Sequence, residues 1–166
     1  YTQTELGLME DDIEKAAVAG AKGVVFGVLD TSYNVANENL TLLKKAKDYG
    51  LEVTFHRAFD LIEGMEAGIS KLIEMGFDRL LTSGMKKNVT EGLLNIQWMQ
   101  HQFGDRIQIM AGGGVNPSNA LQLAATGIQN LHFTSRIEKQ VRNLDDMGKE
   151  MTEDDFKIAG ITALFR

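Results

Sequence analysis

Short apolar runs alternate along the chain with segments of helical periodicity. Continuous runs rich in Val, Ile, Leu and Phe are typical of strands that lie inside a protein. They predict strands at 24–29, 53–59, 79–83, 107–111 and 131–135. In the other segments apolar residues recur every three or four positions, and several of these segments stop at glycine. They predict helices at 5–19, 37–49, 63–75, 91–103, 117–126 and 152–164, whereas 137–150 is polar and is expected to be a loop.

The repeat of strand and helix indicates a parallel sheet with crossover helices. Two architectures are built this way, an open five-stranded sheet of the flavodoxin type and a (β/α)8 barrel. The strand at 53–59 favours the barrel, because Thr54 and His56 fall on one face and apolar residues on the other. An open sheet with helices on both sides prefers two apolar faces. We therefore expect an α/β protein of the TIM (β/α)8-barrel type with only about the last five strand–helix units present, a single domain over residues 1–166 that is incomplete at its N-terminus.

Composition excludes some functions without choosing among the rest. The formal net charge is −6 and Lys and Arg form no cluster, so a nucleic-acid partner is not expected. The sequence has no cysteine, which rules out disulfides and thiolate ligands and fits a reducing compartment. It has no apolar run of transmembrane length and no secretory signal at its start. We therefore expect a cytoplasmic protein with no membrane partner.

Several strand ends are similar to one protein family, CutC. The matching strings stand in the family's order and are GVVFGVL at 23–29, VTFHRAFD at 53–60, LTSG at 81–84 and MAGGGV at 110–115. The segment at 5–13 also resembles the helix that follows the family's third strand, and the similarity extends over roughly residues 1–136. The resemblance implies a TIM-type barrel, a cytoplasmic location and a role in copper homeostasis. It also implies that the family's first strands lie before Tyr1.

Two histidines are the first candidates for a shared site. His56 and His132 lie on the polar faces of their strands, near the carboxyl ends where barrel active sites form. Met110 is expected on the same inward face, and two imidazoles with a thioether suit a soft cation such as Cu(I). In the alternative interpretation, these are core residues that form hydrogen bonds with neighbours such as Thr54 and Gln108. Copper is therefore a possible but unproven cofactor.

Two charged residues follow His56 in the sequence. Asp60 comes after the strand, where a carboxylate near His56 can orient the imidazole or share acid/base work with it. Its alternative role is helix capping. Arg57 either reaches the barrel mouth and binds an anionic substrate, or forms a structural ion pair with a helix carboxylate. Asp30 follows the strand at 24–29 and is expected to be a turn residue.

The triple glycine at 112–114 is the second candidate site. Glycine lets backbone N–H groups come close to a ligand, and Asn116 and Pro117 suit the start of a helix, whose N-terminus favours an anion. In TIM barrels the loops after the seventh and eighth strands commonly bind phosphate. The expected anion-binding residues are Arg57, Ser83, Gly112, Gly113, Gly114, Ser135 and Arg136. The alternative is a tight turn beside a surface arginine.

Three functions are compatible with these candidates. The first is a CutC-like protein of copper homeostasis that binds copper at the mouth of a barrel. The second is a TIM-barrel enzyme for a phosphorylated or otherwise anionic small molecule, with His56 or Asp60 as acid/base and the 112–114 loop as the anion site. The third is a binding or assembly module without chemistry of its own. Homo-oligomerisation is compatible with all three.

Overall fold

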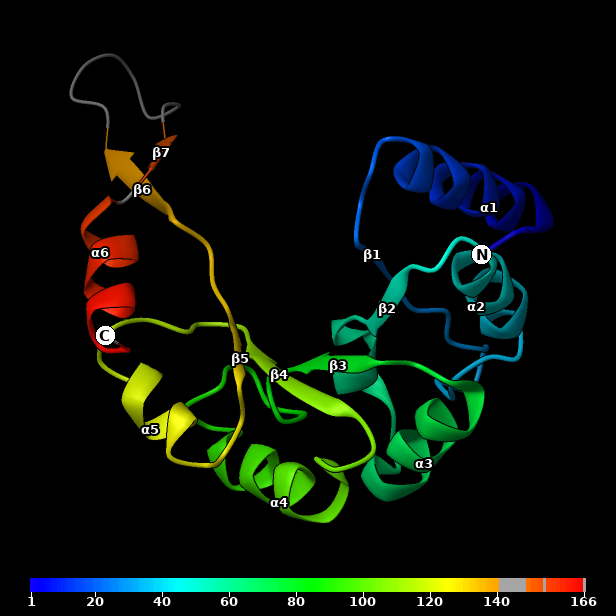
Figure 1. The fold of residues 1–166 in the computed structure, drawn as a ribbon. Helices are drawn as coiled ribbons and strands as arrows, with labels where there is room; N and C mark the ends of the chain where they lie inside the picture. Colours follow the sequence, from blue (N-terminus) through cyan, green and yellow to red (C-terminus); the bar gives the residue numbers. More distant parts are fainter. Residues whose placement is uncertain (141–148, 154, 166) are drawn as a thin grey trace.

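Five parallel strands form one curved sheet in the order β1-β2-β3-β4-β5. The structure is a computed structural model that describes residues 1–140, 149–153 and 155–165, with side chains described for 1–135 and 157–165. The strands are β1 (Gly23–Phe26), β2 (Glu52–Phe55), β3 (Arg79–Thr82), β4 (Gln108–Gly112) and β5 (Asn130–His132). The helices are α1 (Gln3–Val18), α2 (Asn39–Asp48), the 3-10 helix η1 (Arg57–Leu61), α3 (Met65–Met75), α4 (Leu93–Phe103), α5 (Ala120–Ala124) and α6 (Asp155–Ala163). Figure 1 shows α2, α3, α4 and α5 along the outer side of the curve, and none of the helices labelled in it covers the concave side of the sheet.

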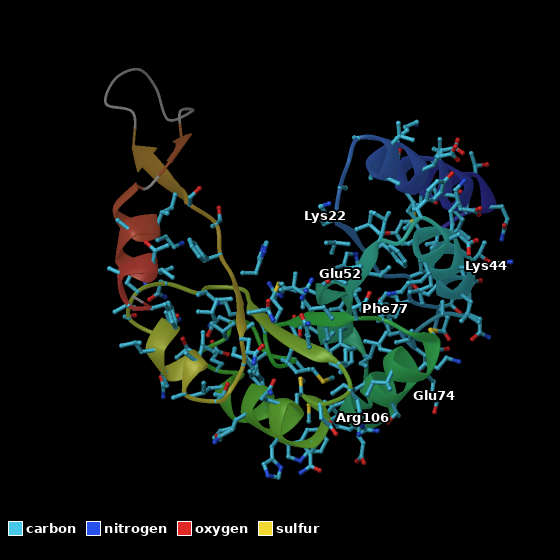
Figure 2. The ribbon with its side chains drawn as sticks, viewed as in Figure 1. Lys22, Lys44, Glu52, Glu74, Phe77 and Arg106 are labelled. Atoms are coloured by element: carbon cyan, nitrogen blue, oxygen red, sulfur yellow. The ribbon has the colours of Figure 1, made fainter. Side chains whose placement is uncertain are left out.

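The strand register separates the two faces of the sheet. Thr54 lies opposite Val25 on one side and Arg79 on the other, and Arg79 lies opposite Gln108. These residues share the concave face, whereas the intervening residues, such as Val53 and Phe55, face the helices and are fully buried. Figure 2 shows Glu52 on the open side of β2 and Phe77 on the side of the helices. A curved parallel sheet with one helix-covered face is part of a TIM-type barrel, so the expected fold class is confirmed, and the barrel is not closed within this chain.

The core lies between the sheet and the outer helices. Three phenylalanines pack edge to face there, with ring centroids 5.6 Å apart for Phe26 and Phe77 and 5.2 Å apart for Phe55 and Phe77. Aromatic pairs in this geometry add to the stability gained from burial. The buried Asn39 side chain bonds both the N–H and the C=O of Val28, so it fixes the chain after β1. The helix-facing side of the sheet is therefore a rigid base for the loops at the strand ends.

Three predicted strands end several residues earlier than expected, and the strand predicted at 131–135 ends at His132. The strand predicted at 24–29 ends at Phe26, and Val25 is 61% exposed although the apolar run predicted burial on both faces. The cause is the uncovered concave face, to which Val25 points. The strand predicted at 53–59 ends at Phe55, and the chain enters η1 directly afterwards. The early end of β2 decides where Arg57 and Asp60 point.

The helix predicted at 117–126 is shorter, because α5 begins at Ala120 with Asn119 at the N-cap position, and Asn116 and Pro117 lie before it. Other differences concern the two ends of the chain. Thr2 rather than Thr4 caps α1, in a capping box with Glu5. The expected loop at 137–150 contains strands β6 (Arg136–Gln140) and β7 (Lys149–Glu153), which pair antiparallel. Thr152 belongs to β7 and therefore does not cap the last helix. None of the helices in the described part of the chain has the length and apolar character needed to cross a membrane.

Candidate functional site

The turn after β2 is built on His56. The His56 Nδ1 atom accepts a hydrogen bond from the Ala58 N–H at 3.3 Å and so caps the N-terminus of η1. Because η1 starts here, Arg57 lies beyond the strand, at its carboxyl end, together with Asp60, which was expected there. We call this edge the mouth, formed by η1 and the loops 83–92 and 113–119. The mouth is where TIM barrels carry their active sites.

Asp60 is the most highly connected side chain at the mouth. Its carboxylate is 7% exposed and accepts hydrogen bonds from Arg57 Nε, Thr82 Oγ1, the N–H and Oγ of Ser83, and the Met85 N–H. A carboxylate that accepts this many hydrogen bonds is held tightly in one position. Asp60 therefore joins η1 to the loop after β3. Its predicted acid/base role stays a prediction, and its contacts are those of an anchor.

Arg57 is held at two of its three guanidinium nitrogens. Nε bonds Asp60 Oδ2 at 2.8 Å, and Nη2 bonds Ser83 Oγ at 2.9 Å. Nη1 has no acceptor among the residues that the structure describes. A Cβ placed on Gly113 would lie 2.8 Å from Nη1, so the guanidinium lies directly against the glycine loop. The ion pair considered for Arg57 is present, and it lies at the mouth with a free nitrogen facing the loop after β4.

The glycine loop is locked through its carbonyl groups. Gly113 and Gly114 have φ angles of +110° and +89°, which side chains other than glycine rarely adopt. The Val89 N–H bonds the Gly113 carbonyl at 2.9 Å, and the Asn116 and Asn119 amides each bond the Gly114 carbonyl at 3.0 Å. Within the described residues, the N–H groups of Gly113 and Gly114 have no acceptor. The loop therefore offers two backbone donors, and Gly113 lies directly against the Arg57 guanidinium.

Charge at the mouth is more positive than in the chain as a whole. Lys86 and Lys87 follow Ser83 in the loop after β3, are exposed, and have no ion-pair partner in the described part of the chain. With Arg57 they provide three cations beside two carboxylates, those of Asp60 and of Glu91 in the same loop. After β1, hydrogen bonds from the backbone N–H groups of Asn34 and Ser32 lower the pKa of Asp30, which caps its own turn.

The three predicted copper ligands differ in how they are placed. Met110 lies opposite Asn130 and Gly112 opposite His132, so Met110 and His132 share a face on neighbouring strands, one step apart diagonally. His56 follows β2, three strands from β5, which is roughly 14 Å along the sheet at about 4.8 Å per strand. Its Nδ1 is an acceptor, so the neutral ring carries its proton on Nε2 and has no free lone pair for a metal there. Among the described residues no three His, Cys, Asp or Glu side chains are gathered as a metal site. Met110 and His132 fit a soft cation as a pair, and His56 does not fit without losing its cap.

The structure gives positions for most of the remaining predicted site residues. Ser83 is fully buried beneath Arg57, and Gly112 packs against the side chains of Leu81 and His132. Ser135 follows β5, and Arg136 begins β6, where its side chain lies outside the described residues. Sequence reasoning missed Asn119, which is 6% exposed and also bonds the Asn116 N–H and Thr90 Oγ1. The signal for it was the asparagine-rich turn after the triple glycine.

A curved parallel sheet, outer helices and a loop cluster at the carboxyl strand ends define a TIM-type β/α-barrel protein. Sequence comparison identifies the family of TIM-type barrels to which this chain belongs. The model of the CutC family matches residues 1–137, and this chain belongs to that family. The CutC family protein of Histophilus somni is 39% identical over 162 residues, which are 95% of this chain and 66% of that protein. The CutC family protein of Bacteroides thetaiotaomicron is 41% identical over 137 residues, 82% of this chain and 55% of that protein.

Solved structures agree with this assignment. The crystal structure of a CutC protein from Streptococcus agalactiae, described as a candidate copper homeostasis protein, matches with a TM-score of 0.74 and 30% identity, over 80% of this chain and 65% of that one. A structure described as native KDPGal matches with a TM-score of 0.62 at 18% identity, over 95% of this chain and 64% of that one, and supports the fold alone. The chain spans about two thirds or less of the length of these relatives.

Proposed function

We propose that this part of a CutC-family barrel binds a small anionic molecule, such as a phosphorylated metabolite, at the mouth between η1 and the glycine loop. One observation carries the proposal. Arg57 Nη1 lies against Gly113, and neither Nη1 nor the N–H groups of Gly113 and Gly114 have an acceptor within the described residues. These are the donors that an oxyanion accepts from, and they come from two separately fixed elements.

The local contacts favour an anion over a neutral ligand. Asp60 neutralises Arg57 only on its Nε side, and the two lysines of the next loop add positive charge. The carbonyl groups of Gly113 and Gly114 are bonded away, so they do not repel an oxyanion. Hydrogen bonds to charged groups contribute about 1.5–3 kcal/mol each. We assign binding here and no reaction, and an acid/base role for His56 stays a prediction.

Calorimetric titration with inorganic phosphate tests the proposal. Arg57→Met should weaken phosphate affinity by roughly 10-fold to 150-fold, the equivalent of one charge-assisted hydrogen bond. Arg79→Met is the matched control, because it removes the same charge from the opposite end of the strands. The proposal fails if wild-type chain binds no phosphate, or if the two variants bind it equally well.

A role in copper homeostasis is the second candidate, favoured by Met110 and His132 on one face and by the description of the Streptococcus agalactiae relative. Imidazole and thioether ligands suit Cu(I). Titration with Cu(I) against a competing chelator should then show a site that Met110→Leu and His132→Asn each remove and that His56→Asn leaves intact. Absence of Cu(I) binding at micromolar metal would end this candidate. A cytoplasmic location belongs to the same proposal and is supported by the lack of cysteine.

A further inference from the structure

We propose that His56 and Asp60 are positioning residues that hold η1 at its two ends and so aim Arg57 Nη1 at the glycine loop. The inference rests on the proposed anion site and gives these two residues a role other than catalysis or metal binding. It also identifies the preformed part of the site as η1 itself. Three sets of contacts lead to it.

The first contacts fix His56. Its Nδ1 atom accepts the Ala58 N–H, which is one of the N–H groups that a helix start leaves unpaired. The ring is confined, because a Cβ on Gly27 would lie 2.7 Å from His56 Nδ1 and the Phe55 ring contacts it edge to face at 5.9 Å between centroids. The imidazole thus works as an N-cap acceptor, and the direction in which the chain enters η1 depends on it.

The second contacts fix Asp60. Its two oxygens bond three successive parts of the β3 end, at Thr82, Ser83 and Met85, besides Arg57. Met85 has a φ of +57°, an uncommon conformation for a residue with a side chain, and its N–H points to Asp60 Oδ1 at 3.0 Å. The carboxylate therefore keeps the loop after β3 in a shape that the backbone alone would not favour.

The third contacts are the hydrogen bonds that fix the Arg57 guanidinium. Nε bonds Asp60, Nη2 bonds Ser83 Oγ, and the Ser83 Oγ itself lies 2.9 Å from Asp60 Oδ2. A planar guanidinium held at two nitrogens has a fixed orientation, so the position of Nη1 follows from it. A lysine at this position could not be held in this way.

Substitutions at His56 separate capping from ligand contact. Asparagine is a good N-cap residue without an imidazole, and alanine provides no acceptor. We expect His56→Asn to bind inorganic phosphate within about threefold of wild type and His56→Ala to bind it about fivefold or more weakly, in line with the loss of a cap. Equal loss in both variants would mean that the imidazole itself acts on the ligand, and no loss in either would mean that capping does not matter. Either result overturns the inference for His56.

An NMR signature tests Asp60 in the intact 166-residue chain. The Arg57 Nε–H should give a resolved signal that exchanges slowly with water, and Asp60→Asn should broaden or remove it and weaken phosphate binding by roughly tenfold. If Asp60→Asn keeps both the Nε–H signal and the affinity, the inference fails for Asp60; if the variant does not fold, the His56 pair decides the inference.

The two proposals fail in different ways. If wild-type chain binds no phosphate, the anion site and the inference fall together. If wild type binds phosphate and Arg57→Met does not, while His56→Ala and Asp60→Asn bind like wild type, only the inference is wrong.

Discussion

Two arginines on the same sheet show how much the surroundings decide what a residue does. Arg79 lies at the amino ends of the strands in a group that we call the floor cluster, with Glu52, Thr54 and Gln108. All three of its guanidinium nitrogens have partners, with Nε and Nη2 on Gln108, Nη1 on Thr54 and Nη2 also on Glu52, and its side chain is 17% exposed. Arg57 at the mouth is 41% exposed and has one nitrogen without an acceptor among the described residues.

The two arginines carry the same charge and differ in how many of their guanidinium nitrogens have a hydrogen-bond acceptor. Arg79 bridges three strands with every nitrogen used, so it has nothing to offer a ligand and holds β2, β3 and β4 in register. Arg57 is held at two nitrogens, and its third has no acceptor among the described residues. Arg57 is partly exposed, so Nη1 can bond water when no ligand is present. A charged donor held in a fixed orientation favours an anion that replaces this water.

The largest effect on stability is expected from the anchor of the mouth. Asp60→Ala leaves Arg57, Thr82 and the Ser83 and Met85 N–H groups without their shared acceptor. Each buried donor that loses its acceptor costs about 1–3 kcal/mol, so the free energy of unfolding should fall by roughly 3 kcal/mol. Urea denaturation measures it, and a loss below about 1 kcal/mol would show that the mouth is not held by Asp60.

A smaller effect is expected at the floor cluster. Arg79→Met removes the guanidinium that donates hydrogen bonds to Thr54 and Gln108, whereas Glu52 can bond water instead. The free energy of unfolding should therefore fall by about 1–3 kcal/mol. Phosphate affinity should stay within about twofold of wild type, because the floor cluster lies at the other end of the strands. A large loss of affinity in this variant would remove the distinction between the two arginines.

The smallest effect is expected at Glu52, which is 59% exposed in its ion pair with Arg79. Glu52→Gln should change the free energy of unfolding by less than about 1 kcal/mol, since exposed ion pairs contribute little. Thermal melting at low and at high salt checks this. A strongly salt-dependent loss would assign the stability of the floor cluster to charge, whereas the account assigns it to the hydrogen bonds with Gln108 and Thr54.

The fold was largely predictable from the sequence because the alternation along the strands carries the information. The polar face at Thr54 and the apolar face at Val53 and Phe55 follow from a period of two. The end of β2 did not follow, because the residues 56–59 keep a strand-like pattern and the cap at His56 forms only when the chain turns. The β6–β7 pair was missed because its short polar strands have no apolar face to reveal them.

The site was predictable as a set of strand ends but not as a set of contacts. The ends of β2, β3 and β4 placed Arg57, Ser83 and Gly113 at one mouth, and the structure brings these three together. The hydrogen bonds that Asp60 accepts, and the cap that His56 Nδ1 forms on η1, depend on distances between segments. A single sequence does not contain these distances. The floor cluster around Arg79 likewise depends on contacts between strands, and no motif in the sequence indicates it.

The most direct measurement of the central claim is a titration of the 15N-labelled chain with inorganic phosphate, followed at the amide signals of Gly113 and Gly114. The account predicts saturable downfield shifts at these two amides and at the Arg57 side chain, absent in Arg57→Met and present in Arg79→Met. Shifts that never saturate, or that spread evenly over the lysines of the surface while Gly113 and Gly114 stay unmoved, would contradict it.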